Sequence, residues 1–130
     1  MYTKIINPII DIYDADTGEF EVTLAVELPH SQEDKLLNLL NRGELFSDLF
    51  IINAEVINAR QGYEPPTVEH PRRRVGVLRL LARDDAGTDV PVEIRMTLTS
   101  QVRGVYPNDP SHLSSIEYTA ILVDSVKRLV

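Results

Sequence analysis

The sequence predicts a mainly β domain of the α+β class. We expect an antiparallel β-sandwich or barrel of five to six strands with one flanking α-helix. Residues 20–28, FEVTLAVEL, alternate apolar and polar side chains, which is the period of a strand with one buried face. Residues 90–98, VPVEIRMTL, repeat that alternation, and only residues 31–43 carry a clear helical stripe. A chain of 130 residues is long enough for one domain with one core.

The first two strands form a predicted hairpin. Residues 5–13 are rich in β-branched side chains, and the turn-forming segment DADTGE separates them from residues 20–28. Pro8 has no N–H to donate, so the first strand is expected to be an edge strand or to be irregular there.

The predicted helix follows the second strand. Ser31 is a suitable N-cap, and Glu33 and Asp34 place negative charge in the first turn, where the helix dipole favours it. Four leucines between positions 36 and 40 form one apolar stripe, and Gly43 is a typical C-terminal stop. Residues 45–50 keep helical spacing, so a second short helical turn is expected there.

Strands are next predicted at residues 51–59, 75–82, 90–98 and 116–126. Residues 61–74, QGYEPPTVEHPRRR, contain three prolines and a glycine, so we expect a proline-rich loop or arm. Residues 106–115 form a second long connection. We interpret residues 1–130 as a single domain.

The acidic segment DDAGTD, before the strand at 90–98, has two interpretations. An EF-hand calcium loop needs glycine at its sixth position, but that position counted from Asp84 is Asp89. Gly18 likewise falls at the fifth position counted from Asp14. Asp and Gly in such segments are typical of tight hairpin turns, and we therefore predict turns at both places.

The residues that usually carry catalysis or bind cofactors are absent or badly spaced. The chain has no cysteine, so it has neither disulfides nor thiolate ligands. His30, His70 and His112 show no ligand spacing, and we interpret them as surface or hinge residues. No glycine-rich phosphate loop and no Gly-x-Ser-x-Gly motif is present. We expect a protein that is not an enzyme and has no cofactor and no metal.

Charge and hydropathy limit the expected partners. The net charge of −7 disfavours a broad contact with a phosphate backbone. The apolar runs are far shorter than the roughly 20 residues that span a bilayer, and the N-terminus does not resemble a signal peptide. We therefore expect no membrane partner, and assembly in the cytoplasm.

The basic residues Arg72, Arg73 and Arg74 lie at the end of the predicted arm. They could contact an acidic partner surface, or they could be solvated or paired with Glu64 and Glu69, and a third reading is a phosphate clamp. If the chain self-associates, we expect the contact residues to be Tyr63 and the three arginines, with Tyr106 and His112 of the second long connection.

The order of elements resembles that of the tail tube proteins of contractile-tailed phages and, more distantly, of type VI secretion tubes. The strand FEVTLAVEL leads directly into the helix HSQEDKLLNLL, and "LLARDDAGTDVPVEIRMTL" is followed by "SIEYTAILVD". The resemblance covers residues 20–50 and 75–124. Residues 61–74 have no counterpart in it, and the section before the first matched strand is shorter than in tube subunits.

The resemblance implies a structural virion protein that assembles into hexameric rings with other tail proteins. Tail terminators and tail completion rings have a similar fold and fit equally well. DNA would pass such a ring without specific binding, which an acidic chain favours. Two other classes stay open: a small acidic phage-type inhibitor that mimics nucleic-acid charge, and a capsid decoration subunit.

Overall fold

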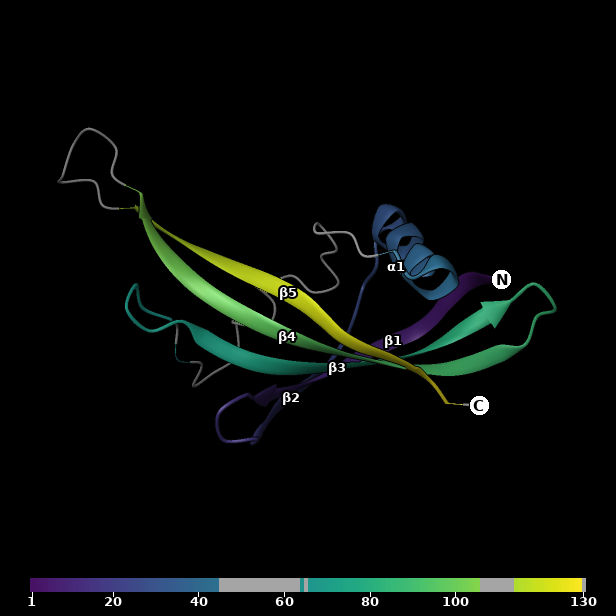
Figure 1. Ribbon diagram of the computed structural model, residues 1–130, viewed down its shortest axis with the longest axis horizontal. Helices are drawn as coiled ribbons and strands as arrows, with labels where there is room; N and C mark the ends of the chain where they lie inside the picture. Colours follow the sequence, from purple (N-terminus) through teal and green to yellow (C-terminus); the bar gives the residue numbers. More distant parts are fainter. Residues whose placement is uncertain (45–63, 65, 106–113, 130) are drawn as a thin grey trace.

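The computed structural model describes residues 1–44, 64, 66–105 and 114–129. It confirms a mainly β protein of the α+β class with one helix (Figure 1). The elements follow one another as β1 (Tyr2–Asp14), β2 (Phe20–Ala25), α1 (His30–Arg42), β3 (Arg72–Asp84), β4 (Asp89–Val105) and β5 (Ser114–Arg128). The strand predicted at 51–59 and the short helical turn predicted before it lie outside the described residues.

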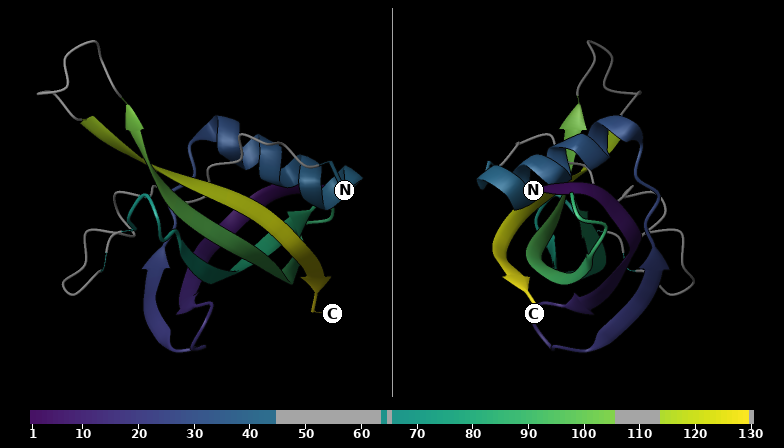
Figure 2. Two further views of the ribbon diagram at one scale, coloured as in Figure 1. Left: turned by 60° about the vertical axis from the view of Figure 1, so that its left-hand side comes forward. Right: turned by 90° about the vertical axis from the view of Figure 1, so that its right-hand side faces the viewer.

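The five described strands form one antiparallel sheet in the order β2-β1-β3-β4-β5. The sheet is strongly twisted and curls, and α1 crosses the open side of the curl (Figure 2). The described strands therefore form an open sheet with one helix, where the expectation was a sandwich or a barrel. Strand alternation predicts a buried face, but it does not report whether the first and last strands meet.

The core lies on the inner face of the sheet, the face that α1 covers. Leu36, Leu39 and Leu40 of the helix pack there. Alternate residues of the central strands complete this cluster, including Ile10, Ile12, Leu78, Leu80, Ile94, Met96 and Leu98. The period of two therefore identified the buried face of β4 correctly, from Val92 to Leu98.

Gly76 lies on this inner face and has a steric role. A Cβ at this position would lie 2.9 Å from Ile10 Cδ1 and 3.0 Å from Met96 Cγ. Ile10 and Met96 are both fully buried, so neither can move away without disturbing the core. The glycine lets strands β1, β3 and β4 pack closely at this point.

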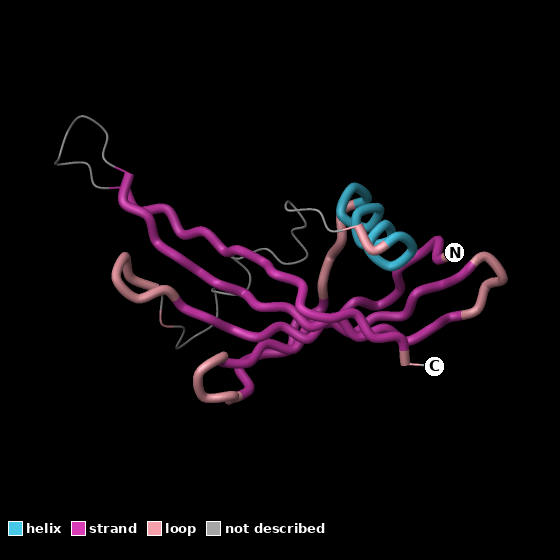
Figure 3. Tube along the Cα trace, viewed as in Figure 1, coloured by secondary structure: helices cyan, strands magenta, loops and turns pink. Residues whose placement is uncertain are grey.

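Strand β1 is interrupted at Asn7 and Pro8, as the proline predicted. The register with β3 shifts between Ile6 and Ile9, and Asn7 has a positive φ of 49°. Beyond this bulge β1 pairs with both β2 and β3, whereas before it β1 pairs only with β3. The bulge therefore divides β1 into a central part and a part with an open side. This second part begins at the N-terminus, which lies near the helix (Figure 3).

Both acidic segments are hairpin turns, as predicted. Asp14 Oδ1 accepts hydrogen bonds from the N–H groups of Asp16 and Thr17, each at 2.9 Å. Asp84 Oδ1 accepts bonds from Ala86 at 3.0 Å and Thr88 at 2.9 Å. Gly18 and Gly87 adopt φ values of 75° and 82°, which L side chains rarely adopt.

Several predicted boundaries differ from the structure. Strand β2 ends at Ala25 and does not extend to residue 28. Helix α1 begins at His30 after Pro29, one residue before the serine expected as its cap, and it has no side-chain cap. Its end is as predicted, because the Gly43 N–H donates to Leu39 O at 3.0 Å. The predicted loop at 61–74 stops earlier, since Arg72 already belongs to β3. The connection expected from 106 to 115 also ends sooner, because β5 begins at Ser114.

Candidate functional site

The three arginines expected in a proline-rich loop or arm are part of strand β3, so their side chains alternate between the two sheet faces. Arg72 forms an ion pair with Glu21 of β2 and lies 3.8 Å from the carboxylate of Asp14. The Glu21 side chain is only 7% exposed, so this pair is largely removed from water. Its partners come from the first hairpin, far away in sequence, and not from the nearby Glu64 and Glu69.

Arg74 is fully buried and donates a 2.8 Å hydrogen bond to the hydroxyl of Ser100 on β4. Arg73, between the two, is exposed on the opposite, outer face of the sheet. The structure thus gives Arg72 and Arg74 contacts within the chain and leaves Arg73 accessible to a partner. Tyr63, Tyr106 and His112 lie outside the described residues, and their role in assembly stays a prediction.

The edges of the sheet are the second candidate for an interaction site. The open side of β1 is closed by side chains of α1. Asn41 accepts from the Tyr2 N–H at 2.7 Å and donates to the Tyr2 carbonyl at 2.9 Å, as a neighbouring strand would. Glu33 accepts from the Ile5 N–H at 3.2 Å. These bonds occupy backbone groups that another strand could otherwise bind.

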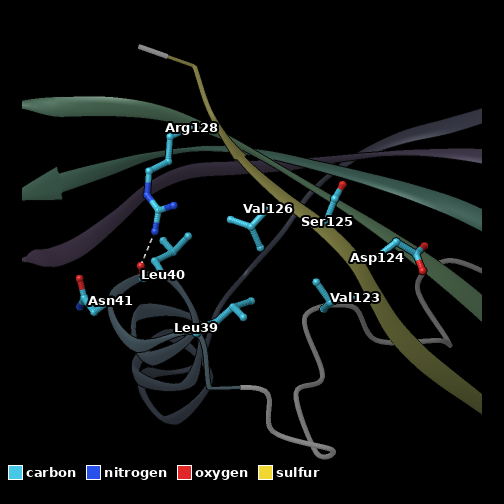
Figure 4. A pocket seen from close by; sticks show the side chains of 9 residues that line it. Leu39, Leu40, Asn41, Val123, Asp124, Ser125, Val126 and Arg128 are labelled. Atoms are coloured by element: carbon cyan, nitrogen blue, oxygen red, sulfur yellow. Dashed lines mark hydrogen bonds between the residues drawn. The ribbon is translucent and has the colours of Figure 1, made fainter.

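The outer edge of β5 is different, since within the described residues β5 pairs only with β4. A groove of about 410 Å³ separates this strand from the C-terminal part of α1 (Figure 4). Leu39, Val123 and Val126 contribute apolar side chains to the groove, and Asn41 and Arg128 contribute polar ones. The groove therefore combines an unpaired strand edge with an apolar wall.

Large apolar side chains are exposed on both edge strands. Leu122 of β5 is 62% exposed, and Phe20 at the start of β2 is 58% exposed. The Phe20 ring contacts the Tyr13 ring edge-to-face, with the centroids 5.7 Å apart, so one side of it is packed. Exposed apolar groups at two unpaired edges favour a binding role for these edges.

Two carboxylates at the hairpin turns, Asp14 and Asp89, have structural partners. Backbone N–H groups of Thr17 and Asp16 hold the pKa of Asp14 below its usual value of 3.8. The Arg83 guanidinium, which binds Asp89 at 2.9 Å, lowers the pKa of that aspartate. Among the described residues no group of three or more His, Asp or Glu is placed to hold a metal ion. In the same part of the chain no helix is long and apolar enough to cross a membrane.

Comparison with known proteins gives no relative. No protein-family model matches the chain, and neither a curated protein nor a solved structure is significantly similar to it. The fold and the edges of its sheet are therefore the basis for a functional proposal.

Asn41 and Arg128 have structural roles that the sequence does not indicate. The guanidinium of Arg128 donates to the Leu40 carbonyl at 2.5 Å and lies 5.7 Å from the centroid of the Tyr2 ring. A basic residue near a chain end gives no signal of such a contact. Asn41 is a polar residue in the last turn of the helix. Asn is common at such positions whatever its contacts, so the sequence does not indicate that it binds the backbone of Tyr2.

Proposed function

We propose that the chain is a structural subunit of a phage tail tube or of a tail-associated ring such as a tail terminator. It acts by self-assembly into rings and catalyses no reaction. The ring number of six, and the place in a virion, come from the resemblance in element order. The observation that carries the proposal is the open sheet of the described strands, in which β5 has one long edge with no described partner strand.

An unpaired strand of this length is a liability in an isolated molecule. Strand β5 spans 15 residues, and a row of free N–H and C=O groups recruits other strands. By contrast, Asn41 and Glu33 bind backbone N–H groups on the open side of β1. These bonds hinder the pairing of another strand with that side. An accessible β5 edge is consistent with a protein in which a strand of a neighbouring subunit pairs with that edge.

The charge on the outer face supports a role that includes passage of DNA without specific binding. Arg79 pairs with Asp11 at 2.8 Å, and Arg95 pairs with Glu93 at 3.1 Å. These cations have a carboxylate beside them, which reduces their attraction for phosphate. The net charge of −7 acts in the same direction.

The test is the mass of the full chain in solution. Size-exclusion chromatography with light scattering, over a concentration series, should give six times the 14.7 kDa chain mass or a larger multiple. Negative-stain images should then contain rings or tubes. A single-chain mass at every concentration would overturn the proposal. If that monomer captured one protein it would be an inhibitor, and if it bound to capsids it would be a decoration subunit.

A further inference from the structure

We infer that the outer edge of β5, together with the groove beside α1, receives strand β2 of a second copy of this chain. This inference rests on the proposed self-assembly and specifies which surfaces meet.

The two edge strands carry matching incomplete rows of apolar side chains. On β2 and just after it, Val22, Leu24, Val26 and Leu28 point to the inner face and are only partly buried. On β5, Ile121, Val123 and Val126 are partly buried on the same face. Each row packs against the core on one side only. Placing β2 of one copy beside β5 of the next would cover both rows at once.

The groove suits such a strand better than it suits a compact ligand. It lies along residues Val123 to Val126 of an unpaired edge, and α1 forms its other wall. An extended chain can pair its backbone with the edge while alternate side chains enter the groove. Leu39 would contact the inward side chains of the added strand. The apolar inner row of β2 provides such side chains.

Strand direction fixes the orientation of the contact. Every neighbouring pair in the order β2-β1-β3-β4-β5 is antiparallel, so β2 and β5 run in the same direction within one copy. If copies are related by rotation about an axis along the strands, the incoming β2 is parallel to β5. Such a contact joins two different surfaces, so it propagates into a ring or a filament and does not stop at a dimer.

The other open edge is excluded as a receiver. Before the Asn7 bulge, the free side of β1 is occupied by Asn41 and Glu33. Among the described strands this leaves β2 and β5 as the edges that can pair. A symmetric pairing of β5 with β5 is the competing arrangement, and it would close as a dimer.

Cysteine cross-linking separates these arrangements, because the natural chain has no cysteine. Ala25→Cys on β2 and Leu122→Cys on β5 introduce thiols at exposed positions on the edge strands. With a short bismaleimide, the double variant should give a ladder of trimers and larger species. A mixture of the two single variants should stop at a covalent dimer, and each single variant alone should remain uncross-linked.

The control variant is Ala86→Cys combined with Leu122→Cys, because Ala86 is exposed in the turn between β3 and β4 and belongs to neither edge strand. The amount of cross-linked product from this control should be less than one tenth of the amount from the Ala25→Cys, Leu122→Cys double variant. Dimers from Leu122→Cys alone would overturn the inference in favour of β5–β5 pairing. Multimers in light scattering with no Ala25–Leu122 product would overturn it while leaving the proposed self-assembly intact. A single-chain mass in light scattering would contradict the proposed function itself.

Discussion

The guanidinium of Arg128, at the end of β5, donates a 2.5 Å hydrogen bond to the carbonyl oxygen of Leu40 in the last turn of α1. Carbonyl groups in the last turn of a helix have no partner within the helix, and a cation there also complements the helix dipole. The same guanidinium lies near the Tyr2 ring, so one side chain joins β5, α1 and the start of β1.

Replacing this side chain should loosen the helix from the sheet. We expect Arg128→Met, which retains an apolar stem, to lower the free energy of unfolding by about 1–2 kcal/mol. Urea unfolding followed by circular dichroism measures this loss. Lys127→Met is the matched control, because Lys127 is exposed and has no contact with α1 among the described interactions. Equal losses in the two variants would contradict the role given to Arg128.

The side-chain amide of Asn41 should protect the start of β1. Asn41→Leu removes both bonds to Tyr2 and should cost about 1–3 kcal/mol, because two backbone groups lose their partners. Asn41→Asp keeps the acceptor and loses the donor, so its cost should be intermediate. Hydrogen exchange at the Tyr2 amide should become faster in the leucine variant. Unchanged exchange would show that the bond contributes nothing to this edge.

Close packing at Gly76 should make this position intolerant of a side chain. We expect Gly76→Ala to destabilise the protein by about 1–3 kcal/mol, since the added methyl group would overlap Ile10 and Met96. Ile10→Val removes the Cδ1 atom that lies nearest to it. The double variant should therefore lose less stability than the sum of the two single losses. Strict additivity in thermal unfolding would contradict this packing argument.

Asp14 should make stability sensitive to acid. Its pKa in the folded chain lies below the usual 3.8, because backbone N–H groups of Thr17 and Asp16 stabilise the ionised form. A lowered pKa contributes stability above the unfolded value, and this stability is lost as the pH falls through the folded value. Asp14→Asn keeps an acceptor oxygen but cannot titrate. The Tm difference between the natural chain and this variant should therefore shrink below pH 3.8.

If that Tm difference stayed constant between pH 6 and pH 2, the titration of Asp14 would not contribute to acid sensitivity. Asp16→Asn is a suitable control, because Asp16 is exposed in the same turn and provides its backbone N–H to the Asp14 carboxylate. Its Tm should follow that of the natural chain at every pH.

Two neighbouring arginines should have separate effects. Arg73→Glu should leave Tm unchanged, because Arg73 is exposed. If the arginine run contributes a contact in addition to the β2–β5 pairing, this variant should weaken self-association by about tenfold, or about 1.4 kcal/mol. Arg95→Glu, at another exposed outer-face position, is the control for simple charge change. Arg74→Ala should instead lower stability by about 3 kcal/mol, since it empties a fully buried site and removes a hydrogen bond to Ser100. Unaltered assembly of Arg73→Glu would remove that residue from the proposed interface.

Local features were predictable because they depend on neighbours in sequence. The alternation of Val92, Ile94, Met96 and Leu98 identified the buried face of β4, and the bulge followed from Pro8. The arginine run was misassigned to a loop because it follows Pro71, while the partners that hold it in a strand are Glu21 and Ser100. Those residues are 51 and 26 positions away.

The sequence by itself determined the positions of the five described strands apart from their ends, the helix with its stop at Gly43, and the two acidic turns. These follow from side-chain periodicity and from backbone dihedrals that only certain residues adopt. Only the tertiary structure decided the strand order, the open sheet and the contacts of Asn41 and Arg128. They depend on segments that are far apart in the chain, and alternation is the same in a closed sheet as in an open one. The sequence therefore predicted the strands, and the fold determined which edges are left for a partner.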